Sequence, residues 1–149
     1  MKLVKKATPA AIAVLRQATA IAPLRMKASD GLLPSKSHIL QNPTSDHNTG
    51  LAVDLTHDKL AGIDCQDLFA RLRVDRRVKY LIFKGRIWSQ DKGERAYTGS
   101  NPHNKHLHIS IKETYAEDTS PWFPWLGTPK AMNKVKAKVK PLPKKKVTK

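Results

Sequence analysis

The chain has 149 residues, 40% of them apolar, which allows one domain with a hydrophobic core but not two full domains. No run of 18 apolar residues occurs, so the sequence predicts no membrane span. A single cysteine, Cys65, excludes an intrachain disulfide and a cysteine-based zinc site.

The net charge of +16 is concentrated at one end of the chain. Residues 130–149 hold nine lysines and no acidic residue, which leaves +7 for the first 129 residues. Repeated Lys-Val and Lys-Ala pairs followed by two prolines are typical of a disordered basic extension. We therefore predict a folded domain over 1–129 and a disordered tail over 130–149. Such a tail would bind a cell-wall polymer or an anionic membrane surface, without specificity for nucleic acid.

The first predicted element is a helix that begins with Thr8 as N-cap and Pro9 at its first position, and ends at Pro23. Lysines before an apolar stretch resemble a signal peptide, but the amphipathic pattern favours a folded helix, and we expect no export signal. Residues 24–46 are expected to be mainly loop. The residues expected to form the buried face of this helix are Ile12, Leu15, Ala18 and Ala22.

Two segments, 51–56 and 106–111, alternate with period two as half-buried strands do. Asp64 is expected to cap a helix that starts at Cys65 and runs to about Arg73, and residues 80–88 read as a hairpin. The sequence thus predicts a small, single α+β domain with a short antiparallel sheet flanked by helices. The residues expected to face its core are Leu51, Val53, Leu55, Leu68, Leu72, Val74, Leu107, Ile109 and Ile111.

Polar side chains on the opposite faces of these strands suggest a metal site. His106 and His108 share the non-core face of one strand, and Asp54 lies on that of the other. If the strands are neighbours, Asp54 and His108 meet. His47 lies seven residues before Asp54, so it must reach the site from the preceding loop, where Gly50 tolerates an unusual turn. Two imidazoles and one carboxylate leave a fourth position open, as a catalytic zinc requires.

A simpler interpretation is a solvent-facing strand whose histidines bind nothing. His38 and His57 lack a comparable pattern and are expected to be structural.

The same residues carry a resemblance. Residues 45–54 match Ser-x-His-x-x-Gly-x-Ala-x-Asp at every fixed position, and 106–110 match a His-x-His strand. The pair resembles the zinc peptidases of the D-alanyl-D-alanine carboxypeptidase type, within the group that includes lysostaphin-like endopeptidases and the hedgehog domain. The segments 54–58 and 97–103 are similar to phage lysis proteins and phage-derived peptidases. The resemblance covers about residues 8–125 and implies the hedgehog-like or D,D-peptidase-like version of the α+β fold.

Carried over, the resemblance makes His47, Asp54 and His108 the ligands of a zinc ion. It places His106, the first histidine of His-x-His, beside the reacting water as general base or transition-state stabiliser.

One position departs from the family pattern. Many members carry a glutamate or aspartate base three residues before the last ligand, where this chain has Lys105. The base is therefore expected to be a histidine, with His103 the second candidate after His106. A swapped assignment, in which His106 is the ligand and His103 lies three residues before it, stays open.

The implied substrate is a peptidoglycan stem peptide, cut between two D-alanines or between L-alanine and D-glutamate. As a phage endolysin, the protein would be a monomer made in the host cytoplasm that acts at the cell wall. Arg25, Lys36 and Arg86 are candidates to hold a substrate carboxylate, and Trp88 and Trp122 to line a groove. Ordinary surface charge and core packing are the competing interpretations for these five residues.

Two other functions fit parts of the sequence. High charge and clustered histidines also suit a metal-dependent nuclease, although the charge lies mostly outside the domain. A non-catalytic wall-binding module of the same fold is the second alternative.

Overall fold

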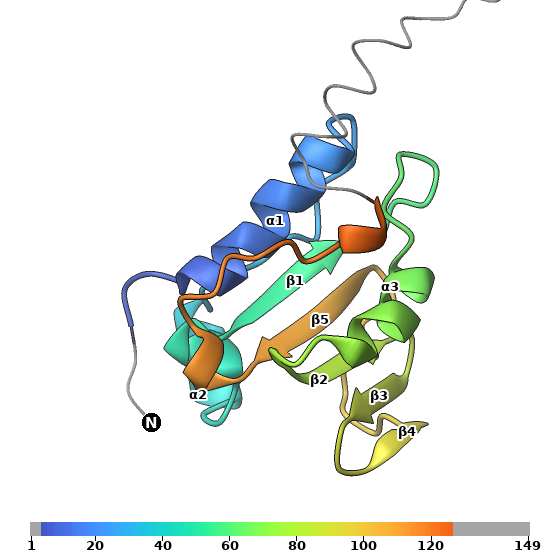
Figure 1. Cartoon of the computed structure of the whole chain (residues 1–149). Helices are drawn as coiled ribbons and strands as arrows, with labels where there is room; N and C mark the ends of the chain where they lie inside the picture. Colours follow the sequence, from blue (N-terminus) through green and yellow to red (C-terminus); the bar gives the residue numbers. More distant parts are fainter. Residues whose placement is uncertain (1–3, 127–149) are drawn as a thin grey trace, which may run out of the picture.

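The computed structural model describes residues 4–126, so the predicted tail over 130–149 lies outside the described residues. The strands β1 to β5 form one antiparallel sheet in the order β1-β5-β2-β3-β4 (Figure 1), which confirms the predicted small α+β domain. The helices are α1 (Pro9–Ile21), α2 (Lys36–Gln41) and α3 (Cys65–Arg71), and the strands are β1 (Ala52–Thr56), β2 (Val78–Phe83), β3 (Arg86–Ser89), β4 (Gly93–Ala96) and β5 (His106–Ile111).

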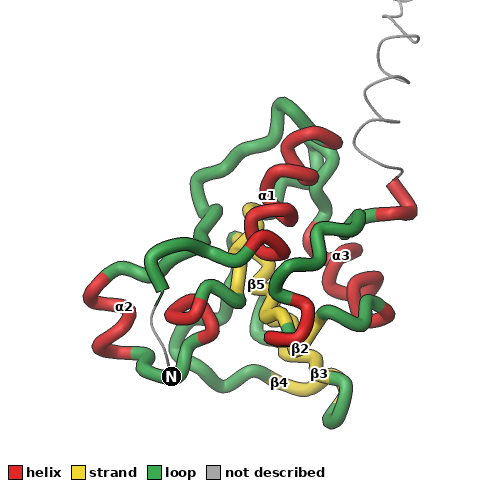
Figure 2. The backbone as a smooth tube through the Cα atoms, turned by 60° about the vertical axis from the view of Figure 1, so that its left-hand side comes forward, coloured by secondary structure: helices red, strands yellow, loops and turns green. Residues whose placement is uncertain are grey.

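The core lies between the sheet and two of the helices. Helix α1 packs against β1, and α3 packs against β2 and β5. Figure 2 shows α2 away from α1 and α3. The apolar side chains of β1 and β5 are buried among those of α1 and α3, so the polar side chains that alternate with them lie on the other face of the sheet.

Helix α1 begins as predicted, and the predicted burial of Ala18 and of the C-cap Ala22 is confirmed, but the rest of its buried face differs. The Thr8 hydroxyl accepts a hydrogen bond from the Ala11 N–H, and Pro9 takes the first helical position. Ile12 and Leu15 are only half-buried. Small side chains let the helix backbone lie close to the sheet, whereas periodicity alone favours the larger residues. The buried residues of α1 are Ala10, Ala11, Ala13, Val14, Ala18 and Ile21.

The other predicted elements are confirmed with local differences. Asp64 caps α3 by accepting from two backbone N–H groups, and Cys65 is buried at the start of the helix. The helix ends in a 3-10 turn, so Val74, predicted to face the core, is 92% exposed. Two elements were not predicted: α2, which Ser35 caps, and β4, whose sequence Gly-Glu-Arg-Ala does not alternate. Within residues 4–126, no helix has the length and apolar character needed to cross a bilayer.

A short segment before α2 extends the sheet beyond β1. Gly31 and Asp54 exchange backbone hydrogen bonds of 3.0 and 2.8 Å. The Asp30 carboxylate anchors this segment, because it accepts from the Arg25 guanidinium at 2.7 Å and from the backbone N–H and hydroxyl of Thr56. The anchor fixes the chain that passes next to Asp54.

We expect Asp30→Asn to lower the free energy of unfolding by about 3–5 kcal/mol at neutral pH, since Arg25 is buried and would lose its charged partner. Burial raises the pKa of Asp30, but hydrogen bonds from Arg25 and Thr56 lower it below its ordinary value overall. The Asp30 carboxylate therefore stabilises the fold fully above its pKa in the unfolded chain, about 3.9. This stabilisation is lost as the pH falls through the lower pKa that Asp30 has in the folded protein. Denaturant titrations across this pH range measure both effects; equal stability of the two proteins at pH 7 would contradict the prediction.

Candidate metal centre

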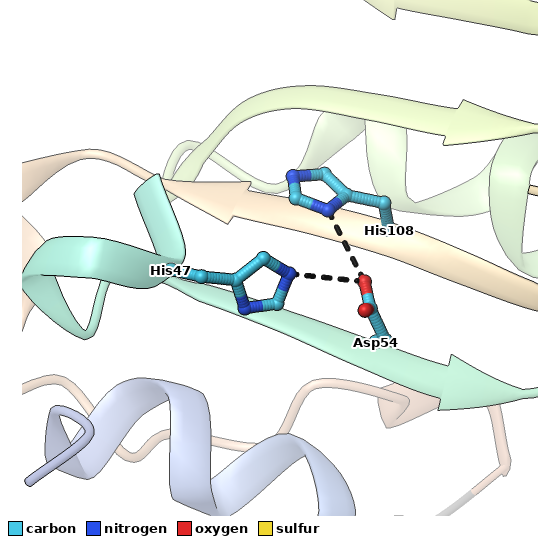
Figure 3. Close-up of side chains that lie close together, drawn as sticks. All are labelled: His47, Asp54 and His108. Carbon is cyan, nitrogen blue, oxygen red and sulfur yellow. Dashed lines mark hydrogen bonds and ion pairs between the residues drawn. The ribbon is translucent and has the colours of Figure 1, made fainter. Parts of the chain in front are cut away.

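Three side chains from three elements converge on the polar face of the sheet (Figure 3). Asp54 on β1 and His108 on β5 are directly paired in the strand register, as the alternation predicted. His47 comes from a 3-10 turn over Asp46–Thr49, just before β1. All three side chains are largely buried, with exposed fractions of 8% for His47, 20% for Asp54 and 7% for His108.

The turn that delivers His47 depends on Gly50. Gly50 caps the 3-10 turn in the left-handed region, with φ of +75°. A Cβ atom there would lie 2.9 Å from the backbone oxygen of Lys6, so any other residue would clash as well as strain the backbone. The structure confirms that His47 reaches Asp54 through a turn at Gly50.

One carboxylate oxygen lies between the two imidazoles. Oδ1 of Asp54 is 3.3 Å from Nε2 of His47 and 3.1 Å from Nδ1 of His108. These three residues form a group that could hold a metal ion.

The far nitrogens of both rings have fixed partners. Nδ1 of His47 donates to the backbone oxygen of Leu32 at 2.7 Å, and Nε2 of His108 lies 2.8 Å from the hydroxyl of Ser110. A histidine that donates from one ring nitrogen keeps a lone pair on the other, and such partners are typical of metal-binding histidines. Sequence reasoning assigned no role to these partners. A backbone oxygen has no residue signature, and the alternation that places His108 on the polar face also places Ser110 there without indicating a function.

The charges of the three groups are strongly coupled. Burial raises the pKa of Asp54, but hydrogen bonds from His108 and His47 bring it well below its ordinary value. Burial lowers the pKa of His47, yet the neighbouring Asp54 carboxylate raises it overall. The Asp54 carboxylate favours a proton on His47, and a metal ion bound to the group would take the place of that proton.

His106 and His103 lie beside this group. Nε2 of His106 is 3.7 Å from Oδ2 of Asp54, and the His103 and His106 rings are 4.9 Å apart. Nδ1 of His103 and Nε2 of His106 are buried without a hydrogen-bond partner among the described residues. Burial lowers the pKa of His106 and lowers that of His103 to about 4, so both rings are neutral at pH 7 and can accept a proton.

The loop that carries His103 is held in an unusual conformation. His103 has φ of +62°, and its backbone oxygen accepts from the Lys84 N–H at 3.1 Å. Pro102 accepts from the Gly85 N–H in the same way, at 2.9 Å. Backbone strain of this kind in a non-glycine residue is concentrated at functional sites.

A second group that could hold a metal, Asp54 with His103 and His106, shares the same carboxylate. One carboxylate would leave two nearby dications poorly neutralised and strongly repelling, so we expect a single ion. The group with His47 and His108 fits it better, because its nitrogens lie nearer to the Asp54 carboxylate and both rings have partners on their far side. His103 and His106 would then flank an ion bound by that group.

A cavity of about 600 Å³ lies over Asp54, His47 and His108. Its wall is made mostly of amides, hydroxyls and rings, and the described residues that line it include one carboxylate, that of Asp54, and no lysine or arginine. His103 lines this cavity, whereas His106 borders a smaller hollow of about 280 Å³ next to it. The other residues that give the wall its polar character include Asn42, Thr44, Ser45, Tyr80, Tyr97 and Asn101.

The residues predicted to bind substrate do not line the cavity. Arg25 is buried against Asp30, and Arg86 pairs with Glu94 at the hairpin edge. Trp88 packs against the core, and Lys36 is exposed on α2.

The remaining predicted positions are structural in their contacts. Trp122 is fully buried and donates to the backbone oxygen of Ala10, so it belongs to the core rather than to a groove. His57 accepts from the Cys65 N–H, as a structural histidine does. His38 lines the cavity with its ring bonded to Ser45 and is not part of either metal-binding group.

Comparison with known proteins identifies a family for this chain. No curated protein and no solved structure matches the chain. A family model described as VldE, C-terminal domain, matches residues 4–108. This segment is more than two thirds of the chain and contains all five residues of the two metal-binding groups. The chain therefore belongs to the VldE C-terminal domain family.

Proposed function

We propose that the protein is a zinc-dependent peptidase that hydrolyses peptidoglycan stem peptides, in the manner of a phage endolysin. The observation that carries the proposal is the group of His47, Asp54 and His108 under a polar cavity, flanked by two neutral histidines. The resemblance to D-alanyl-D-alanine carboxypeptidase-like enzymes supplies the substrate class. On this proposal the protein acts at the bacterial cell wall.

The distances in the group suit zinc. Ligand atoms 2.0–2.1 Å from a tetrahedral zinc ion are about 3.3 Å from one another. The contacts of Asp54 Oδ1 with His47 and His108, at 3.3 and 3.1 Å, agree with this spacing. Two imidazoles and one carboxylate are also a ligand set of catalytic rather than structural zinc, because a position remains for the reactants.

Zinc bound here would lower the pKa of a water molecule to about 7 and polarise the scissile carbonyl. His106 accepts the proton of the attacking water at Nε2, which has no hydrogen-bond partner among the described residues. His103, whose ring lines the cavity, faces the substrate side of the site. Proton return to the leaving amine completes the hydrolysis and restores a neutral His106.

The cavity wall favours an internal peptide bond over the last bond of a chain. Charge-assisted hydrogen bonds from a lysine or arginine would hold the free carboxylate of a C-terminal residue more strongly than neutral donors do. No lysine or arginine lines the cavity among residues 4–126, and the predicted candidates lie elsewhere. Amide and hydroxyl groups instead match the backbone of a peptide that continues on both sides of the cleaved bond.

Digestion of purified peptidoglycan tests this function. We expect release of new amino groups with zinc, none with a chelator, and fragments whose masses show cleavage within the stem. Release of free alanine alone would show a carboxypeptidase and contradict the internal cut. Zinc binding without any hydrolysis would indicate the non-catalytic wall-binding module, and cleavage of nucleic acid alone would indicate the nuclease.

A further inference from the structure

We infer that Ser110, Tyr80 and Asp46 form a hydrogen-bonded support chain behind His108, which fixes the tautomer and orientation of this ring for metal binding through Nδ1. The inference makes Tyr80 and Asp46 positioning residues, and it rests on the proposed metal site. Neither residue is a member of the group that would hold the ion, although the Tyr80 ring stacks on His108 and Asp46 directly precedes His47.

The first link is the contact between His108 and Ser110. Nδ1 of His108 faces Asp54 and must keep its lone pair to bind a metal, so the ring hydrogen is on Nε2. This N–H donates to the Ser110 hydroxyl at 2.8 Å, and Ser110 is completely buried. The hydroxyl hydrogen of Ser110 is then free to donate to a further acceptor.

Tyr80 supplies that acceptor. It is the register partner of Ser110 across β2 and β5, and its ring stacks on His108 with centroids 5.4 Å apart and planes 15° apart. Its hydroxyl lies close enough to both Ser110 and Asp46 to interact with them. A hydroxyl that accepts from Ser110 donates to the Asp46 carboxylate, so every hydrogen in the chain points away from His108 and toward a negative charge.

An irregularity in β2 brings the end of the chain into place. The β2–β5 register shifts between Val78 and Tyr80, so Lys79 is an extra residue in the strand. Such a bulge redirects side chains, and bulges are common beside active sites. Tyr80 and Lys79 both reach Asp46: Nζ of Lys79 lies 3.1 Å from the carboxylate, which is 12% exposed. Lys79 thereby holds Asp46 in position.

The chain has a chemical consequence for His108. Hydrogen bonds that run toward a carboxylate polarise one another and make the ligating nitrogen a better electron donor. Loss of such an outer partner typically weakens metal binding by 10- to 100-fold. Tyr80→Phe keeps the stacked ring and removes only the hydroxyl, so it isolates this contribution.

The test is the zinc dissociation constant of the full-length protein, measured by competition with a chromophoric chelator. We expect Tyr80→Phe and Asp46→Asn each to raise it about 10-fold. The double variant should bind zinc about as tightly as the weaker-binding of the two single variants, because both substitutions interrupt the same hydrogen-bonded chain. The absorption spectrum of the cobalt-substituted protein should shift in both variants. Tyr97→Phe is the matched control, since Tyr97 lines the same cavity and contacts His103 but not Ser110.

If Tyr80→Phe has the same zinc affinity and the same cobalt spectrum as the wild type, the support chain is wrong, but the proposed zinc site is not contradicted. Additive losses in the double variant would also overturn it, because independent effects do not describe a chain. Failure of the wild type itself to bind zinc would overturn the proposed site and the support chain together. Thermal unfolding of the metal-free variants shows whether each is folded, and the cobalt spectrum reports the ligand environment directly.

Discussion

His108→Ala is expected to abolish zinc binding and to lower peptidoglycan hydrolysis by about 10³–10⁴-fold. The substitution removes one of three ligands and leaves the Asp54 carboxylate with one imidazole partner in the group. Metal-ion catalysis is worth several kcal/mol, and each 1.36 kcal/mol corresponds to a factor of ten in rate. Zinc content and amino-group release from purified walls measure the two losses.

His38→Ala provides the matched control for this variant. His38 lines the same cavity and lies 5.7 Å from the His47 ring, but it is not one of the candidate ligands. We expect it to keep zinc and most of the activity. Chelation should reduce wild type and His38→Ala to the level of His108→Ala, and added zinc should restore only the first two. Full activity of His108→Ala would rule out this ligand set.

The sequence carried enough information to predict which residues form the candidate metal-binding group. Alternation with period two placed Asp54 and His108 on the non-core faces of their strands, and the structure pairs them directly. The odd spacing of His47 required a turn, and Gly50 makes it. Both features could be predicted because strand periodicity and a glycine turn depend on only a few consecutive residues.

The missed features depend on contacts between distant segments. Arg25 looks like a substrate-binding cation in the sequence, but its partner Asp30 buries it. Leu32 and Ser110 hold the two imidazoles from opposite sides, and neither is marked by charge or hydropathy. The buried face of α1 was predicted only in part: Ala18 and Ala22 are buried, but Ile12 and Leu15 are half-buried. The short distance between α1 and β1 decides that small residues are buried there, and sequence periodicity contains no information on that distance.

His106→Ala is expected to lower the turnover of the zinc-loaded protein by about 10²–10⁴-fold, the range for loss of a general base. His106 accepts the proton in the proposed reaction and has no ligand role in the favoured group, so the variant should still bind zinc. Burial lowers the pKa of His106, and a bound cation would lower it further. The acidic limb of kcat/KM in the wild type therefore lies below the ordinary histidine pKa of about 6.5, and this limb should disappear in His106→Ala.

His103→Ala distinguishes the two candidate bases. The pKa of His103 is lowered to about 4, which makes its ring a weaker base than a group nearer to neutrality. We expect His103→Ala to lose less turnover than His106→Ala and to keep the acidic limb. Because His103 lines the substrate cavity, its loss should instead raise KM. If His103→Ala removes the acidic limb and His106→Ala removes the metal, the swapped assignment is correct: His106 is then the third ligand, and His103, three residues before it, is the base.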